Sequence, residues 1–214
     1  MTHNLSNVTT APINDATSPR GVTTLAADAT TISNEEIQLL PLKTFNGKIT
    51  LIQTADELVP VINILEQADV LGFDTETRPS FKKGEFHQVA LLQIGIPGNV
   101  FLIQLQKTGL PEGMAKILSN PNIIKAGVAI RDDIKALQKL RRFTPAGFVD
   151  LSVMARENGI GVESVKKLTA LLLGFRISKT AQTSNWETPT LSEKQIEYAA
   201  TDAWVCLEIY RKLV

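Results

Sequence analysis

One stretch of the sequence decides the fold: Val70-Leu71-Gly72-Phe73-Asp74-Thr75-Glu76-Thr77. Its first four residues are uncharged and mostly apolar, which is typical of a buried strand, and we expect that strand to end on Asp74. Asp74 and Glu76 are two positions apart on extended backbone, so their side chains project from the same face. Two like charges placed so close repel each other unless a cation binds between them. The stretch therefore predicts a central strand with an acidic site.

The segments around this strand predict a sheet with helices on both sides. Strands are expected at residues 48–53, 89–96, 100–103, 123–128 and 148–149. Helices are expected at 55–67, 111–118, 132–140, 151–157, 162–173 and from Ser192 towards the C-terminus. Early strands followed by alternating helices and strands are typical of an α/β fold. We expect a mixed sheet of five or six strands flanked by helices.

The composition is that of an ordinary globular domain, with 43% hydrophobic and 21% charged residues. Basic and acidic residues balance at 22 each, so attraction for a polyanion would depend on local clusters. No apolar run approaches the roughly 18 residues needed to cross a bilayer. Cys206 is the single cysteine, which excludes an internal disulfide and suits a reducing compartment. We therefore expect an intracellular, cytoplasmic protein with no membrane segment.

Residues 1–38 differ in composition from the rest of the chain. They are rich in Thr, Ala, Asn and Ser and show no lasting hydrophobic period, which predicts a flexible N-terminal tail. A targeting peptide is the alternative, but Arg20 is the only Lys or Arg among these residues. We expect the ordered domain to cover residues 39–214.

Two further acids extend the acidic site. Asp202 lies one helical turn after Tyr198, so the two side chains share a face of the C-terminal helix. Asp133 lies in the first turn of the helix at 132–140, and its neighbour Asp132 is the alternative for this position. With one cysteine and two histidines in the chain, a thiolate or imidazole zinc site is close to excluded. Any catalytic metal would be held by carboxylates.

These four carboxylates suit a site for two divalent cations. They carry a charge of about −4, which two Mg²⁺ ions neutralise. Two such ions about 3.5–4 Å apart can clamp the attacking and leaving oxygens of a phosphodiester. The Tyr198 hydroxyl would then orient the attacking water. Some of these acids also have a structural explanation on their own. An acid in the first turn of a helix, such as Asp133 or Asp132, is favoured by the helix dipole, and a Tyr198/Asp202 pair is more often a solvated helix face.

Three motifs, in this order, resemble those of the DEDD exonuclease superfamily. Phe73-Asp74-Thr75-Glu76-Thr77 is similar to the first motif and Gly127-Val128-Ala129-Ile130-Arg131-Asp132-Asp133 to the second. Tyr198-Ala199-Ala200-Thr201-Asp202 matches the third motif in its tyrosine form, DEDDy. Ser184-Asn185-Trp186 adds similarity to Werner-type exonuclease domains, and RNase D is the other near relative. The resemblance implies an RNase H-like fold and a 3′→5′ exonuclease that uses two Mg²⁺ or Mn²⁺ ions.

The resemblance also implies a role for each of these residues. Asp74 is expected to bridge both metal ions. Glu76 and Asp202 are expected to complete the site of the ion that holds the nucleophilic water. Asp133 is expected to support the second ion through water, and Tyr198 to position the attacking water.

Five further residues are candidates for substrate binding. Lys82 and Lys83 follow the first motif and could meet phosphates, although a lysine pair is more often a solvated surface. His87 and Gln88 precede a strand near the site, where they would touch the terminal nucleotide or serve as surface residues. Trp186 would stack on a base or, as is commoner, pack in the core.

The expected substrate is a nucleic-acid 3′ end, from which nucleoside 5′-monophosphates are released. Werner-like features favour DNA, and RNase D-like processing of RNA 3′ ends is the alternative. A non-catalytic nucleic-acid-binding module on the same fold is a second alternative, for which loss of one metal ligand would be the signature. No ligand is lost here. A subunit of a larger assembly is a third, and the sequence identifies no protein partner.

Overall fold

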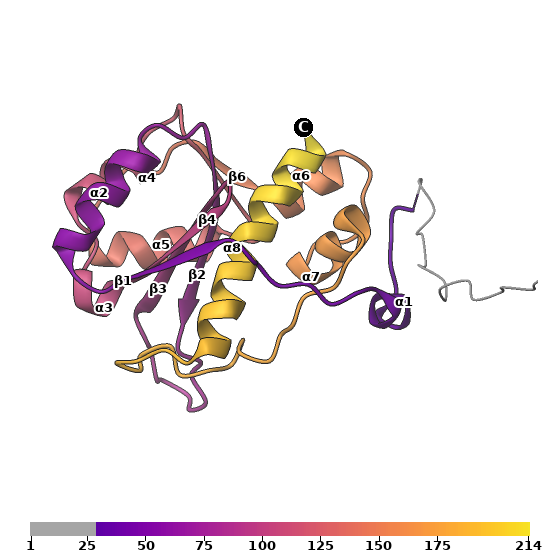
Figure 1. The fold of residues 1–214 in the computed structure, drawn as a ribbon, viewed down its shortest axis with the longest axis horizontal. Helices are drawn as coiled ribbons and strands as arrows, with labels where there is room; N and C mark the ends of the chain where they lie inside the picture. Colours follow the sequence, from indigo (N-terminus) through magenta and orange to yellow (C-terminus); the bar gives the residue numbers. More distant parts are fainter. Residues whose placement is uncertain (1–28) are drawn as a thin grey trace, which may run out of the picture.

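The computed structural model describes residues 29–214 as a six-stranded mixed sheet between two layers of helices (Figure 1). The strand order is β1-β4-β3-β2-β5-β6. Strand β3 is antiparallel to β2 and β4, and the other neighbours are parallel. This confirms the predicted α/β fold with a mixed sheet of five or six strands, and the number observed is six. The strands are β1 (Lys48–Ile52), β2 (Val70–Thr77), β3 (Val89–Ile96), β4 (Asn99–Gln104), β5 (Ile124–Gly127) and β6 (Phe148–Asp150).

Helices cover both faces of the sheet. One face packs against α2 (Ala55–Leu65), α4 (Glu112–Leu118) and α5 (Arg131–Leu140) around one apolar core. The other face packs against α8 (Glu193–Leu213), with α6 (Leu151–Glu157) and α7 (Val165–Leu168) beside it. The remaining helical segments are α1 (Asn34–Leu39), α3 (Leu105–Thr108) and a π-helical turn, η1 (Thr169–Leu173). In residues 29–214 no helix is long and apolar enough to cross a membrane.

Strand β2 extends further than the sequence predicted. It continues to Thr77, so Asp74 and Glu76 lie within it, and the prediction that the strand ends on Asp74 was wrong. The reason is β3, which pairs with β2 along this whole segment and places Gln93 opposite Asp74. On the other side, β5 pairs only with residues 70–72, so β2 has no strand neighbour there beside the two acids.

Helix α8 lies unusually close to the middle of the sheet. Gly72 and Gly95 are paired across β2 and β3, and both face this helix. A Cβ atom on Gly72 would lie 2.0 Å from the carbonyl oxygen of Ala203, and one on Gly95 would lie 3.0 Å from the same atom. The two glycines and the small Ala203 side chain therefore let α8 rest on β2, which brings Asp202 beside Asp74.

The expected N-terminal tail contains an ordered segment. Helix α1 begins with a capping box between Ser33 and Glu36, and Ile37 is fully buried in a small cluster with Leu40 and Ala170. The tail was predicted to extend to residue 38, and for this part of it the prediction was wrong. A helix of six residues is too short to show a hydrophobic period. The rest of the expected tail, residues 1–28, lies outside the described residues.

Candidate active site

Three carboxyl groups meet where α8 crosses β2. Asp74, Glu76 and Asp202 each offer one oxygen atom within 4.8 Å of the others. Glu76 is 9% exposed and Asp202 is 3% exposed. They line a cavity of about 200 Å³, with these other residues around it: Thr75, Val128, Val165, Gln182, Tyr198 and Cys206. The structure thus brings together three of the four acids singled out in the sequence.

The fourth acid, Asp133, lies at the edge of this cluster. Its carboxylate accepts a hydrogen bond from the hydroxyl of Thr75, which lies between Asp74 and Glu76 on β2. The neighbouring Asp132 points away from the site, with a side chain that is 91% exposed and 2.9 Å from Lys135 Nζ. The geometry therefore favours Asp133 over Asp132 as the fourth member of the site.

Burial raises the pKa of each acid in the cluster, and the charges of neighbouring carboxylates raise it further for Asp74 and Glu76. For Asp74 the largest cause is burial, followed by the charges of Asp202 and Glu76, and its pKa lies well above the usual value. Burial and the charge of Asp202 raise the pKa of Glu76 to about 9. Burial raises the pKa of Asp202 to about 7, although the nearby Tyr198 hydroxyl opposes the shift. A cation in place of the protons would relieve this repulsion, so the cluster suits a metal ion.

Tyr198 borders the acids and is fixed by an aromatic neighbour. Its ring lies 6.0 Å from that of Trp186, measured between centroids, at a tilt of 39°. Trp186 is only 1% exposed, so it has no free face for a nucleotide base. The expectation that Trp186 stacks on a base was wrong, because the tryptophan is buried against Tyr198. Trp186 therefore packs against the ring of Tyr198 and supports it.

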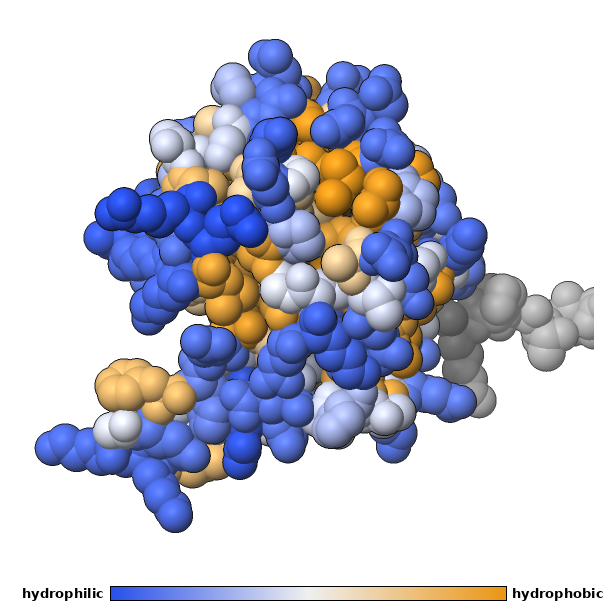
Figure 2. Space-filling view, turned by 90° about the vertical axis from the view of Figure 1, so that its left-hand side faces the viewer, coloured by the Kyte–Doolittle hydropathy of each residue, from blue (hydrophilic) through white to orange (hydrophobic). Residues whose placement is uncertain are grey.

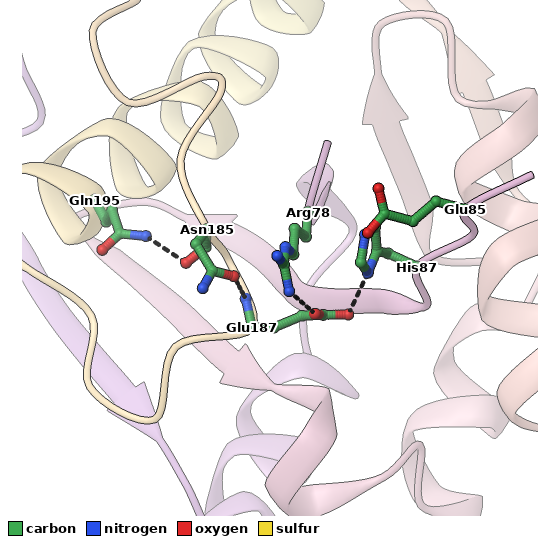
Figure 3. A network of polar contacts seen from close by, with 6 residues as sticks. All are labelled: Arg78, Glu85, His87, Asn185, Glu187 and Gln195. Atoms are coloured by element: carbon green, nitrogen blue, oxygen red, sulfur yellow. Dashed lines mark hydrogen bonds and ion pairs between the residues drawn. The ribbon is translucent and has the colours of Figure 1, made fainter. Parts of the chain in front are cut away.

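The other residues expected to bind substrate lie outside the cavity. His87 is held between two acids, with Nδ1 3.0 Å from Glu187 Oε1 and Nε2 3.3 Å from Glu85 Oε1. Glu187 also pairs with Arg78, at 3.2 Å, and Figure 3 shows its carboxylate between Arg78 and His87. His87 therefore fastens the loop in which it lies. The remaining candidates are exposed on that same loop: Lys82, Lys83 and Gln88.

Gln93 is a polar residue of the site that was missed in the sequence. It lies opposite Asp74 on β3 and is fully buried. Neither its Nε2 nor its Oε1 has a hydrogen-bond partner among residues 29–214. Gln93 lies close enough to Glu76 to lower the pKa of that carboxyl group, which partly offsets the rise that burial causes. A glutamine inside the apolar run Val89–Ile96 was the available signal.

A six-stranded mixed sheet with buried acids on its central strand is the arrangement of an RNase H-like exonuclease domain. A family model described as 3'-5' exonuclease matches residues 49–214. The chain belongs to this 3'-5' exonuclease family, which confirms the resemblance seen in the sequence. The acidic cluster is compatible with the divalent-metal dependence of the family.

Individual relatives agree with this assignment. The chain is 35% identical over 155 residues to the mouse "Bifunctional 3'-5' exonuclease/ATP-dependent helicase WRN". The aligned segment covers 70% of this chain and 11% of the mouse protein. The chain is 32% identical over 181 residues to the human "Exonuclease mut-7 homolog", covering 70% of this chain and 20% of that protein. The chain thus spans a fifth or less of these relatives. The crystal structure of the Aedes aegypti Nibbler EXO domain superposes with a TM-score of 0.71 at 25% identity, covering 80% of this chain and 90% of that one.

Proposed function

We propose that this chain is a metal-dependent 3′→5′ exonuclease that hydrolyses nucleic-acid 3′ ends and releases nucleoside 5′-monophosphates. The observation that carries the proposal is the meeting of Asp74, Glu76 and Asp202 in one cavity, in a chain of the 3'-5' exonuclease family. The four acids and the tyrosine of the three motifs are all present, and the departure from some relatives is Ala129 in the second motif, at a position that is not a metal ligand. A non-catalytic binding module would have no reason to keep three mutually repelling, buried carboxyl groups together.

We assign two divalent cations, Mg²⁺ or Mn²⁺, to the four acids. Asp74 is affected by the charges of Asp202, Glu76 and Asp133, which supports its place among the residues that would hold the ions. Glu76 and Asp202 would hold one ion and Asp133 would support the other. Ions bound there supply Lewis-acid catalysis and lower the pKa of a bound water. Oxygen ligands alone, with no thiolate or imidazole among the four, fit Mg²⁺ and Mn²⁺.

Tyr198 has the properties of a group that positions water. Burial, and then the charges of Asp202 and Glu76, raise the pKa of its hydroxyl above the usual value. The hydroxyl therefore stays protonated at neutral pH and can donate one hydrogen bond while accepting another. It cannot act as a base under these conditions. Its contribution would be to hold the attacking water in line with the phosphate.

Tyr198→Phe is expected to lower kcat by about 10²-fold, because the water loses its orientation while the ring still packs on Trp186. The measurement is the single-turnover rate of trimming of a single-stranded oligonucleotide with saturating Mn²⁺, alongside the stabilisation that Mn²⁺ gives in thermal unfolding. That stabilisation should be unchanged. Tyr210→Phe, at the only other tyrosine of the chain, is the matched control. A rate equal to that of the unaltered protein would remove Tyr198 from the mechanism.

Gln93→Leu is expected to raise the Mn²⁺ concentration needed for half-maximal activity by about 10- to 100-fold. The buried amide lies next to Glu76 and opposite Asp74, where it would orient the carboxylate towards a cation. Stability should stay equal or rise, because an unpaired buried amide is removed. Gln104→Leu is the control, because this buried amide is hydrogen-bonded to Gln53 and to the Thr188 carbonyl, so its loss should destabilise the fold instead. An unchanged metal dependence would make Gln93 a packing residue only.

We propose that DNA is the preferred substrate and that RNA 3′ ends are the alternative. The preference for DNA rests on the segment Ser184-Asn185-Trp186, which resembles Werner-type exonuclease domains. The metal chemistry does not depend on the sugar, whereas contacts to the 2′-OH would. Trimming rates on single-stranded DNA, recessed-end DNA and RNA of one sequence test the preference. Faster trimming of RNA than of both DNA substrates would reverse it.

A further inference from the structure

The loop between β2 and β3 is fastened at both of its ends. Arg78 near its start and His87 near its end both bind the carboxylate of Glu187, at 3.2 and 3.0 Å (Figure 3). The Glu187 side chain is only 22% exposed, so both contacts lie partly out of water. Residues 79–86, here called the arm, therefore lie between two anchored residues, Arg78 and His87, which form the base of the arm. In Figure 1 this loop projects beyond the end of the sheet.

The base of the arm is tied to the helix of the active site. The Glu187 amide donates a hydrogen bond to Asn185 Oδ1, at 3.1 Å, and Gln195 Nε2 donates to the Asn185 carbonyl, at 3.2 Å. Gln195 lies on α8, one turn before Tyr198. The position of the arm relative to the acids is therefore fixed by hydrogen bonds through a single short segment.

The arm exposes two aromatic rings and two positive charges. Phe86 is 91% exposed and Phe81 is 82% exposed, which makes them the two most exposed large hydrophobic residues of the described chain. Lys82 and Lys83 lie between them and are also exposed. Figure 2 shows hydrophobic surface on a projection at the lower left, among hydrophilic residues. Burying an aromatic side chain is favourable, and neither ring is buried by residues 29–214.

The arm lies within reach of the nucleotides that precede the 3′ end. Phe81 follows Glu76 by five residues, and even fully extended backbone of that length spans at most about 18 Å. At a rise of about 3.4 Å per nucleotide, this is the length of about five stacked nucleotides. A strand of about five nucleotides with its 3′ end at the acids is therefore long enough to reach the arm.

We propose that the arm binds single-stranded nucleic acid just upstream of the 3′-terminal nucleotide, with Phe81 and Phe86 stacking on bases and Lys82 and Lys83 neutralising phosphates. Aromatic faces combined with positive charge are what proteins use to bind single strands without reading their sequence. The binding site is new, and it rests on the proposed function for the position of the 3′ end. Stacking and phosphate contacts serve DNA and RNA alike.

The first test measures binding with cleavage prevented. A 5′-labelled single-stranded 12-nucleotide DNA is titrated with protein in EDTA and followed by fluorescence anisotropy. F81A/F86A is expected to weaken binding by at least about tenfold, since stacking on each base contributes strongly. V59A/I64A, which shortens two exposed apolar residues of α2, is the matched control and should bind normally. Equal affinity for F81A/F86A and the unaltered protein would overturn the proposal.

The second test isolates the lysines. K82A/K83A should reduce the slope of log K against log salt by about 1.4, because each phosphate contact to a single strand contributes about 0.7. K116A/K139A removes two exposed lysines from α4 and α5, which pack on the face of the sheet opposite α8, and should leave the slope unchanged. An unchanged slope in K82A/K83A would remove the lysines from the binding site.

Two further outcomes separate the arm from the proposed function. If the 12-mer binds through the arm and no mononucleotide is released with Mn²⁺, the proposed function fails and the arm proposal stands. If F81A/F86A loses self-association in size-exclusion chromatography but keeps its affinity for the 12-mer, the arm is a protein-docking surface and the proposal is wrong. All four substituted side chains of the arm are exposed, so the variants should unfold at the temperature of the unaltered protein.

Discussion

Replacing Asp74 by asparagine is expected to lower the rate of 3′-end hydrolysis by at least about 10³-fold. Asp74 repels all three of the other acids, so it lies at the centre of the set that would hold both ions. Losing this shared ligand would remove several kcal/mol of metal-ion catalysis, and 1.36 kcal/mol corresponds to a factor of ten. The measurement is the release of mononucleotides with Mg²⁺ or Mn²⁺. Asp132→Asn, at the exposed neighbour of Asp133, is the control and should keep near-normal activity.

The same Asp74→Asn variant should unfold at a higher temperature than the unaltered protein in EDTA at pH 8. The pKa of Glu76 is about 9 in the folded protein, against an ordinary value of 4.5, so the folded state binds more protons between these two values. The free energy of unfolding therefore decreases as pH rises through this window, and the decrease is complete above about pH 9. The variant removes one charge from the cluster and should show a weaker pH dependence. Equal pH profiles for both proteins would contradict the repulsion described for the cluster.

Gly72→Ala is expected to destabilise the protein by about 1–3 kcal/mol or more and to abolish most of its activity. The new Cβ atom would lie 2.0 Å from the Ala203 carbonyl oxygen and 3.0 Å from the Leu207 amide nitrogen, and both are backbone atoms of α8. The helix would have to move away from β2 and would take Asp202 with it. The measurements are urea unfolding at constant Mn²⁺ and the trimming rate.

Gly113→Ala is the matched control for this substitution. Its Cβ atom would meet side-chain atoms of Ile62, at 2.7 Å from Cδ1 and 3.3 Å or more from the others, and in residues 29–214 no backbone atom of another element lies nearer. Alanine is also the better residue within a helix. We expect this variant to be about as stable as the unaltered protein and fully active. If Gly72→Ala were equally harmless, the close contact of α8 with β2 would not be what positions Asp202.

Much of the candidate site could be predicted because local patterns carry it. The apolar run before Asp74 marked a buried strand, and the four-residue spacing of Tyr198 and Asp202 put both on one helix face. The expected starts of the helices after Thr54 and at Ser192 agree with the structure, because each of these residues forms a capping box with the residue three positions later. These signals lie within a few residues of one another in the chain.

The parts that were missed depend on contacts between distant residues. The length of β2 is set by its pairing with β3, and the burial of Trp186 by its contact with Tyr198 across the loop before α8. His87 pairs with Glu187, one hundred residues away in the sequence, and no local sequence pattern predicts such a pair. Gln93 looked like an ordinary strand residue because only the register with Asp74 shows that it faces the acids.

We propose that Asp74, Glu76, Asp133 and Asp202 together hold the metal ions of a 3′→5′ exonuclease. The most direct test of this proposal is to incubate a 5′-labelled single-stranded oligonucleotide with the purified protein and Mn²⁺, then resolve the products by length. The expected result is a ladder that shortens from the 3′ end with release of 5′-mononucleotides, abolished by EDTA and by Asp74→Asn. No trimming with either Mn²⁺ or Mg²⁺, or equal trimming by the Asp74→Asn variant, would contradict it.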